Sequence, residues 1–426
     1  MLLSGGTVID QTGARRADVL VKGDVVSEVA APGELSRPAG ALVLDAEGCF
    51  VAPGLVDLHC HLREPGGEEA ETIETGSRAA ALGGYTAVVA MPNTEPAASS
   101  AAVVRHVLQL SRTALCDVRP AGTITEGRLG RSLANLAEMA AEGVRIFTDD
   151  GNGVADPALM RRAMEYSRSL GAVIADHCED PALVGDGCMN EGAVSSLLGL
   201  PGRPAVAEEV MVLRDLALAR ATGARLHLLH VSTAGAVSAL RAAKAAGVAV
   251  TAEATPHHLA LEEDCVVGYD TSYKVNPPLR SHEDRSVLLE AMRDGVVDAI
   301  ATDHAPHPPE AKQVSFCEAA PGMVGLETAF GAACTYLGLP IERVLALMSW
   351  QPAAIAGLAG THGGPVAPGA AANLCVLDPG RQWTVVSSAL ASRSRNTPFA
   401  GRRLAGRARH TVLAGEPVVI AEEAQR

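Results

Sequence analysis

Short apolar segments alternate with helix-like segments through most of the chain. Eight apolar segments rich in β-type residues recur at 51–61, 85–91, 117–123, 143–148, 172–177, 225–231, 248–254 and 296–303. Between them lie segments rich in Ala, Leu, Glu and Arg, such as 131–141, 156–170, 205–221 and 234–246. This alternation predicts βαβ units and a parallel sheet. Eight such units predict an α/β fold, a (β/α)8 TIM-like barrel with functional residues at the carboxyl ends of its strands.

The two ends of the chain show a different pattern of short strands and turns. Residues 1–50 contain the turn signals Gly5-Gly6 and Pro32-Gly33, and residues 362–426 contain Asp378-Pro379-Gly380. Neither end has enough apolar alternation for a stable sheet of its own. We therefore expect both ends, 1–52 and 362–426, to pair into one small β-sandwich domain beside a barrel formed by 53–361.

The composition argues against nucleic acids and membranes as binding partners. The 426 residues carry a net charge of −14 and only 3% aromatic side chains. An acidic chain without a stripe of Lys and Arg predicts no binding to nucleic acid or to an anionic membrane. The amino-terminal residues lack the charge and apolar run of a signal peptide, and no apolar run reaches the roughly 18 residues that span a bilayer. We expect a cytoplasmic protein whose nine cysteines, none in a CxxC motif, are reduced thiols.

The strongest local signal is the run Asp57-Leu58-His59-Cys60-His61-Leu62-Arg63, which follows an apolar segment. On a strand, side chains two residues apart share one face, so His59 and His61 point the same way while Cys60 faces the helical layer. Two imidazoles about 7 Å apart can converge on one metal ion, because each binds it at about 2.0–2.1 Å. The run predicts part of a metal site.

Further ligand-type residues end other predicted strands. His177, His230 and Asp303 each follow an apolar segment, and the fourth strand ends in Asp149-Asp150. One of these two aspartates could bridge two ions, and the spacing leaves both open. Four histidines and two aspartates predict two divalent metal ions with a hydroxide held between them, because metal binding lowers the pKa of water to roughly 7. Asp303 is placed to move the proton of that nucleophile.

Two motifs give the chain a resemblance to a known family. Asp57-Leu58-His59-Cys60-His61-Leu62-Arg63-Glu64-Pro65-Gly66 looks like the first, and Ala301-Thr302-Asp303-His304-Ala305-Pro306-His307, with Lys312 five residues on, looks like the second. Over essentially its full length the chain resembles the amidohydrolase superfamily and, within it, the long bacterial class of dihydroorotases.

The resemblance implies which residues hold the metals. His59, His61 and Asp303 would bind one zinc ion, His177 and His230 the other, and Asp150 would bridge them. Many relatives bridge with a carboxylated lysine instead, but this strand carries Arg145 and no lysine. The chain therefore looks like the aspartate-bridged branch, whose activity should not require carbon dioxide to build the site.

The resemblance also implies a reaction, the reversible hydrolysis of the cyclic amide of (S)-dihydroorotate to N-carbamoyl-L-aspartate in pyrimidine (UMP) biosynthesis. Asp303 would be the catalytic residue. Arg63 suits the remote carboxylate of the substrate, because a guanidinium offers paired donors. The residues expected to bind substrate are His61, Arg63, Asn93, Asn276, His307, Pro321 and Gly322.

Two other functions compete with this interpretation. One is an allantoinase or hydantoinase-like cyclic amidohydrolase, which would share the fold and the ligands. The other is a non-catalytic scaffold for aspartate transcarbamoylase, although such relatives usually lack metal ligands. Association of an active enzyme with that transcarbamoylase, and formation of a homo-oligomer, are further expectations compatible with the resemblance.

Several other polar residues have a plainer interpretation. We expect His257 and His258 to be structural, His304 to point away from the site and Lys312 to be a loop lysine. The histidines in polar or turn contexts are predicted to lie on the surface: His106, His282, His362 and His410.

Overall fold

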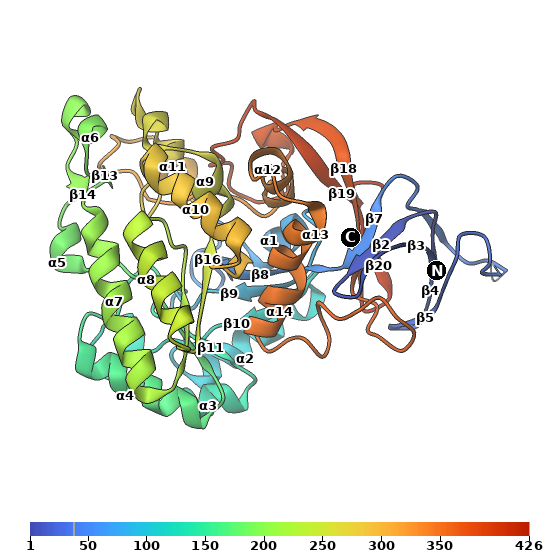
Figure 1. Ribbon diagram of the computed structural model, residues 1–426, viewed down its shortest axis with the longest axis horizontal. Coiled ribbons are helices and arrows are strands. Elements are labelled where there is room, and N and C mark those ends of the chain that lie inside the picture. Colours follow the sequence, from blue (N-terminus) through green and yellow to red (C-terminus); the bar gives the residue numbers. More distant parts are fainter. Residues whose placement is uncertain (37–38, 426) are drawn as a thin grey trace.

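Eight parallel strands form the barrel in the computed structural model, which describes residues 1–36 and 39–425 (Figure 1). The strands are β8 (Leu55–Cys60), β9 (Tyr85–Ala90), β10 (Asp117–Pro120), β11 (Ile146–Phe147), β12 (Val173–Asp176), β15 (Arg225–Leu228), β16 (Val250–Ala254) and β17 (Ala299–Ile300). They make two parallel sheets, β10-β9-β8 and β11-β12-β15-β16-β17. Isolated parallel bridges, Gly122 with Phe147 and Cys60 with His304, join these sheets on both sides into one ring.

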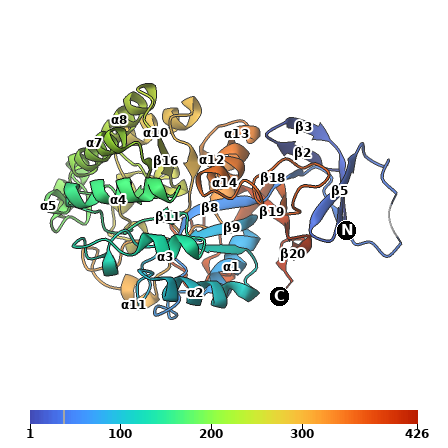
Figure 2. The ribbon, with the colours of Figure 1, turned by 90° about the horizontal axis from the view of Figure 1, so that it is seen from below.

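Helices cover the outside of the ring (Figure 2). They include α1 (Ile73–Leu82), α2 (Ala101–Leu110), α3 (Leu136–Ala141), α4 (Pro157–Ser169), α7 (Ala205–Thr222), α8 (Ala234–Ala245), α10 (His282–Asp294) and α12 (Ala329–Tyr336). Several begin where a Ser, Thr or Asp side chain accepts from a first-turn N–H group, as Thr72, Asp156 and Thr233 do. These caps fix where each crossover turns back towards the barrel.

Two predicted elements are shorter than the sequence pattern indicated. The helix expected at 131–141 begins only at Leu136, because the Asn135 side chain caps it. The strand expected at 143–148 is reduced to Ile146–Phe147. Beyond it the chain leaves the sheet, and Asp149 turns back to accept from the backbone N–H of Ile124 at 2.9 Å.

Both ends of the chain form the small domain, where the N and C labels lie in Figure 1. Its four-stranded sheet has the order β5-β4-β1-β6 and its seven-stranded sheet the order β21-β20-β19-β18-β7-β2-β3. The strands are β1 (Leu2–Ser4), β2 (Thr7–Asp10), β3 (Gly13–Arg16), β4 (Asp18–Lys22), β5 (Val25–Ala30), β6 (Val43–Asp45), β7 (Phe50–Pro53), β18 (Leu374–Thr384), β19 (Arg403–Leu413), β20 (Glu416–Ile420) and β21 (Glu423–Ala424). Arg37, Pro38 and Arg426 lie outside the described residues.

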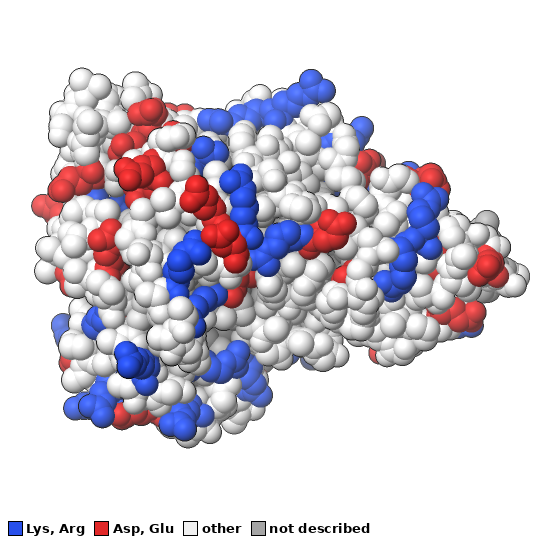
Figure 3. All heavy atoms as spheres, in the orientation of Figure 1, with Lys and Arg blue, Asp and Glu red and all other residues white. Residues whose placement is uncertain are grey.

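Small aliphatic side chains fill the barrel, as the low aromatic content requires. Residues such as Ala87, Val173 and Ala299 pack in one cluster with Ile355 of α14 (Gln351–Ile355). Cys60 instead packs in the layer beneath α1, as predicted. Within the described ranges no helix is long and apolar enough to cross a membrane. Figure 3 shows acidic and basic side chains interspersed over the face in view.

Candidate metal centre and substrate pocket

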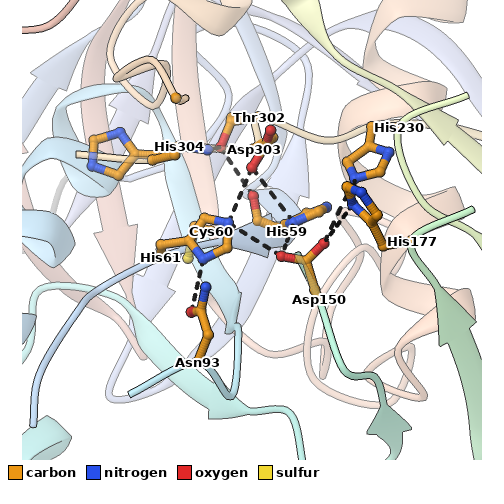
Figure 4. A network of polar contacts seen from close by, with 12 residues as sticks. His59, Cys60, His61, Asn93, Asp150, His177, His230, Thr302, Asp303 and His304 are labelled. Atoms are coloured by element: carbon orange, nitrogen blue, oxygen red, sulfur yellow. Dashed lines mark hydrogen bonds and ion pairs between the residues drawn. The ribbon is translucent and has the colours of Figure 1, made fainter. Parts of the chain in front are cut away.

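Six polar side chains from five strands meet at the carboxyl ends of the barrel strands (Figure 4). They are His59, His61, Asp150, His177, His230 and Asp303, and each is at most 5% exposed. Parallel strands bring their carboxyl ends to one face of a barrel, so residues far apart in sequence converge there. The structure thus brings together every residue predicted as a metal ligand.

One group of possible ligand atoms surrounds Oδ2 of Asp150. The Nε2 atoms of His59 and His61 lie 3.2 and 3.4 Å from this oxygen. The same two nitrogens lie 3.5 and 3.1 Å from Oδ1 of Asp303. Two imidazole nitrogens and two carboxylate oxygens form a donor set that suits zinc and related divalent ions.

A second group surrounds the other oxygen of Asp150. Oδ1 lies 3.5 Å from Nδ1 of His177 and 3.6 Å from Nε2 of His230. The two imidazole nitrogens are 2.8 Å apart. Asp150 therefore faces both groups, one with each oxygen. Asp149, the alternative left open by spacing, accepts instead from the backbone of Ile124 and Thr125 and from the Thr125 hydroxyl.

Unpartnered buried atoms and an ionised carboxylate make the cluster suitable for binding cations. Nε2 of His59 and Oδ1 of Asp150 are buried without a hydrogen-bond partner among the described residues. A buried polar atom without a partner costs free energy unless an ion or water satisfies it. Burial alone would raise the pKa of Asp150, but the neighbouring His59, His177 and His230 hold it well below its usual value. The carboxylate is therefore ionised and available as a ligand.

Three further side chains orient the imidazoles from behind. Glu253 lies 2.8 Å from Nδ1 of His59, Glu179 lies 3.1 Å from Nε2 of His177, and Asn93 lies 2.9 Å from Nδ1 of His61. Such partners fix the ring orientation of metal-binding histidines and raise their basicity. The sequence analysis missed Glu253 and Glu179. A carboxylate inside the apolar strand Val250–Ala254 was the available signal, because unpaired carboxylates are rarely buried.

Two residues of the cluster and one pocket residue have a left-handed backbone. His230, Asp303 and Arg63 have φ values of 31°, 44° and 61°. Non-glycine residues seldom adopt this region, so the surrounding structure must hold these three in place.

A cavity of about 180 Å³ opens beside the cluster. All seven residues expected to bind substrate line it: His61, Arg63, Asn93, Asn276, His307, Pro321 and Gly322. Arg128, which the sequence analysis did not single out, also lines it, from a turn after β10. The pocket therefore combines metal-binding side chains with two guanidinium groups.

Arg63 is fixed within this pocket. Its Nε donates to the carbonyl of Pro306 at 3.2 Å, and an Nη atom lies 3.4 Å from Nε2 of His307. Burial lowers the pKa of Arg63 to about 10, against the opposing effect of Asp303 and Asp150, so the guanidinium stays charged at neutral pH. Burial and the charge of Arg63 lower the pKa of His307 to about 3, so that imidazole is neutral.

Two side chains fix the loop that carries His307 and Gly322. Lys312 is 8% exposed, and its Nζ donates to the carbonyls of Ala320 at 2.8 Å and Gly322 at 3.2 Å. Asn396, from the C-terminal part of the chain, donates to the Gly322 carbonyl at 3.1 Å and accepts from the His307 N–H at 3.1 Å. Lys312 is thus more than an ordinary loop lysine, contrary to expectation, because its ammonium replaces water at buried carbonyls.

Among the other histidines, His304 lies as predicted, whereas two others do not. His304 points away from the cluster, as predicted, and contacts Glu71 at 3.2 Å. His362 and His410 were expected on the surface, and this is wrong, because they are only 2% and 3% exposed. His362 lies between Thr86 and Asp117, and His410 contacts the backbone of Asp45.

The chain resembles known proteins over its whole length. A family model described as dihydro-orotase-like matches residues 48–236. A dihydroorotase of Anaeromyxobacter dehalogenans is 50% identical, with 98% of this chain and 97% of the relative covered. A dihydroorotase of Streptomyces coelicolor is 48% identical, with 98% of each chain covered.

Solved structures of hydantoinases have the same fold. The L-hydantoinase (dihydropyrimidinase) of Arthrobacter aurescens matches with a TM-score of 0.89 and 25% identity, over 100% of this chain and 97% of that one. A D-hydantoinase from Thermus sp. matches with a TM-score of 0.84 and 26% identity, over 99% and 96%. The fold is shared with hydantoinases at 25–26% identity, but the full-length identity of 48–50% to dihydroorotases is much higher. The chain belongs to the dihydroorotase family of the amidohydrolase superfamily.

Proposed function

We propose that the protein is a dihydroorotase, which interconverts (S)-dihydroorotate and N-carbamoyl-L-aspartate in pyrimidine biosynthesis. The observation that carries the proposal is the position of Arg63, a charged guanidinium that lines the same cavity as Asp150 and Asp303. A cyclic amide placed over the metal-binding side chains would present its exocyclic carboxylate to this group.

Two zinc ions are the cofactors that the donor set favours. His59, His61 and Asp303 would hold one ion, His177 and His230 the other, and Asp150 would contact both. When bound, two such ions lower the pKa of water and polarise the amide carbonyl. The bridging group would be an aspartate of the chain itself, so assembly of the site would need no carbon dioxide.

Asp303 is the proposed proton carrier. Burial alone would raise the pKa of Asp303, but the charge of His59 and the hydrogen bond and charge of His61 lower it, so the resting group is an ionised carboxylate. In the hydrolytic direction it takes the proton from the attacking water and delivers it to the departing ring nitrogen. General acid–base catalysis of this kind contributes about 10²–10⁴-fold to a rate.

The other pocket residues orient the ring. Arg63, with Asn93 and neutral His307 beside it, would hold the exocyclic carboxylate, a charged hydrogen bond worth about 1.5–3 kcal/mol. His61 belongs to the cluster and also lines the pocket beside this subsite. Asn276 and the backbone of Pro321 and Gly322 would hold the ring on the opposite side, since the buried Oδ1 of Asn276 has no hydrogen-bond partner in the part of the chain that the structure describes.

Product formation tests the proposal against its rivals. Metal-replete protein incubated with dihydroorotate should release N-carbamoyl-L-aspartate, identified by chromatography, and the reverse reaction should close the ring. Allantoin and hydantoin serve as parallel substrates for the allantoinase and hydantoinase alternatives. Absence of dihydroorotate turnover by protein of verified metal content would contradict the proposal, and absence of any turnover would favour a scaffold.

Four expectations about the wider context stay predictions. Association with aspartate transcarbamoylase would appear as co-elution or as a gain in activity on mixing, and a homo-oligomer would appear in light scattering. The cytoplasmic location is testable by cell fractionation. The domain boundaries at 52/53 and 361/362 are testable by limited proteolysis.

A further inference from the structure

Two cysteines that lie far apart in sequence meet beside the pocket. The Sγ atoms of Cys188 and Cys317 are 2.9 Å apart, across a separation of 129 residues. Cys188 is buried at 4% exposure, whereas Cys317 is exposed. Neither residue has a part in the proposed chemistry.

The two cysteines belong to different loops at the mouth of the barrel. Cys188 lies between α5 (Pro181–Val184) and β13 (Met189–Asn190), in the segment that follows His177. Cys317 lies in the segment after β17, between the pocket residues His307 and Gly322. Any bond between these sulfurs would therefore tie a loop next to the metal cluster to the loop that closes the substrate side.

The surroundings hold both sulfurs in place. Cys188 packs in one cluster with Phe316, the neighbour of Cys317, and with Val266. Nζ of Lys274 donates to the Cys317 carbonyl at 2.7 Å, which anchors the exposed residue to the segment that carries Asn276. A disulfide bond requires its sulfurs at about 2.05 Å, so closure from 2.9 Å needs a movement of about 0.9 Å.

We propose that Cys188 and Cys317 form a reversible disulfide bond that ties the loop after β12 to the loop after β17 at the mouth of the pocket. The oxidant is a low-molecular-weight disulfide. Disulfides in a reducing compartment are usually transient and regulatory, which suits a pair with one exposed partner.

The exchange proceeds in two balanced steps. The exposed Cys317 thiolate attacks one sulfur of the small disulfide and releases one small thiol, leaving a mixed disulfide on Cys317. Cys188 then loses its proton and attacks the Cys317 sulfur, which displaces the second small thiol. Overall two protein thiols are oxidised and one small disulfide is reduced to two thiols. Burial and the adjacent Cys317 raise the pKa of Cys188 to about 12, so Cys188 acts as the resolving group and not as the first nucleophile.

Mass spectrometry of the native, metal-loaded protein tests the bond. Fully reduced protein is incubated with oxidised glutathione and quenched by acid; one portion is weighed intact without alkylation, and a second portion is alkylated before peptide mapping. We expect the mass to fall by that of two hydrogen atoms, with a cross-linked peptide joining Cys188 to Cys317. Cys265→Ser, a control at another partly exposed cysteine, should give the same cross-link.

The single variants separate the two steps. Cys188→Ser should stop at one glutathione on Cys317, and Cys317→Ser should give no cross-link and no modified Cys188. Accumulation of the mixed disulfide on wild-type protein without the internal bond would overturn the proposal. A cross-link from Cys188 to a different cysteine in Cys317→Ser would also overturn it. Hydrogen exchange measures whether the bond restrains the loop that carries Cys317. Amides at 313–319 should exchange several-fold more slowly in the oxidised form, and equal rates would contradict a restraint between the two loops. Neither readout uses activity, so both are independent of the proposed function.

Discussion

Replacement of Glu253 by glutamine should weaken metal binding selectively at one of the two proposed sites. Glu253 is fully buried, with one oxygen 2.8 Å from Nδ1 of His59 and the other 3.0 Å from Nε2 of His227. Burial alone would raise the pKa of Glu253, but these hydrogen bonds lower it to about 2, so it faces His59 as a carboxylate. Loss of such an anionic partner costs about 10–100-fold in metal affinity, or roughly 1.4–2.7 kcal/mol.

Glutamine is the appropriate substitution because it preserves the contacts. Its carbonyl can accept from Nδ1 of His59, and its amide can donate to Nε2 of His227, whose Nδ1 then donates to the Thr251 hydroxyl, 2.8 Å away. The fold should therefore survive, and only the negative charge is lost.

The assay is a zinc titration of metal-free protein against a chromophoric chelator. Wild-type protein should show two bound ions, and Glu253→Gln should lose affinity at one of them. Glu179→Gln alters the hydrogen-bond partner of His177 and should lower the zinc affinity of the other proposed site. Glu262→Gln, at a carboxylate paired with His282 and Arg285 away from the cluster, is the control. Unchanged zinc affinity in Glu253→Gln would refute the role assigned to this carboxylate.

Substitutions at three other positions test the proton carrier, the pocket loop and a buried carboxyl group. Asp303→Asn should reduce kcat by at least about 10²-fold. The unfolding midpoint should change little, because asparagine tolerates the left-handed backbone at this position. Near-normal turnover would show that Asp303 does not carry the proton. Lys312→Met should raise KM for dihydroorotate more than it lowers kcat, because the Ala320 carbonyl loses its Nζ donor and the Gly322 carbonyl keeps only Asn396. Lys312→Arg should recover part of the loss, and unchanged kinetics in Lys312→Met would show that the loop keeps its position without the ammonium. Burial raises the pKa of Glu327 from 4.5 to about 7, so the folded state binds more protons than the unfolded state between these values, and stability falls as pH rises through this window. Relative to Glu327→Gln, the wild-type free energy of unfolding in urea should drop by roughly 3 kcal/mol between about pH 5 and about pH 8, and a difference independent of pH would contradict the shift.

The sequence predicted the parts of this fold that depend on local pattern. Apolar segments of strand type, separated by helix-like segments, located all eight barrel strands, because each βα unit must bury its own apolar face. The same pattern placed His59, His177 and Asp303 on one face, since parallel strands share the direction of their carboxyl ends.

Other features depend on tertiary contacts that no local pattern contains. Glu253 and Asp150 are neighbours of His59 only once the barrel closes. Burial of His362 follows from its position between β9 and the side chain of Asp117, although Thr361 and Gly363-Gly364 beside it in sequence are typical of a turn. Arg128 reaches the pocket from a turn with positive φ at Gly127 and at Arg128 itself, a conformation that the sequence does not specify.

The comparison of dihydroorotate with 5,6-dihydrouracil tests the central claim most directly, because the two rings differ by the carboxylate that Arg63 is proposed to hold. A charged hydrogen bond of about 1.5–3 kcal/mol corresponds to a preference of roughly 10–150-fold in kcat/KM. The account predicts at least this preference for dihydroorotate in metal-replete wild-type protein, and its collapse in Arg63→Gln. Equal kcat/KM for the two substrates, or a preference for dihydrouracil, would contradict it.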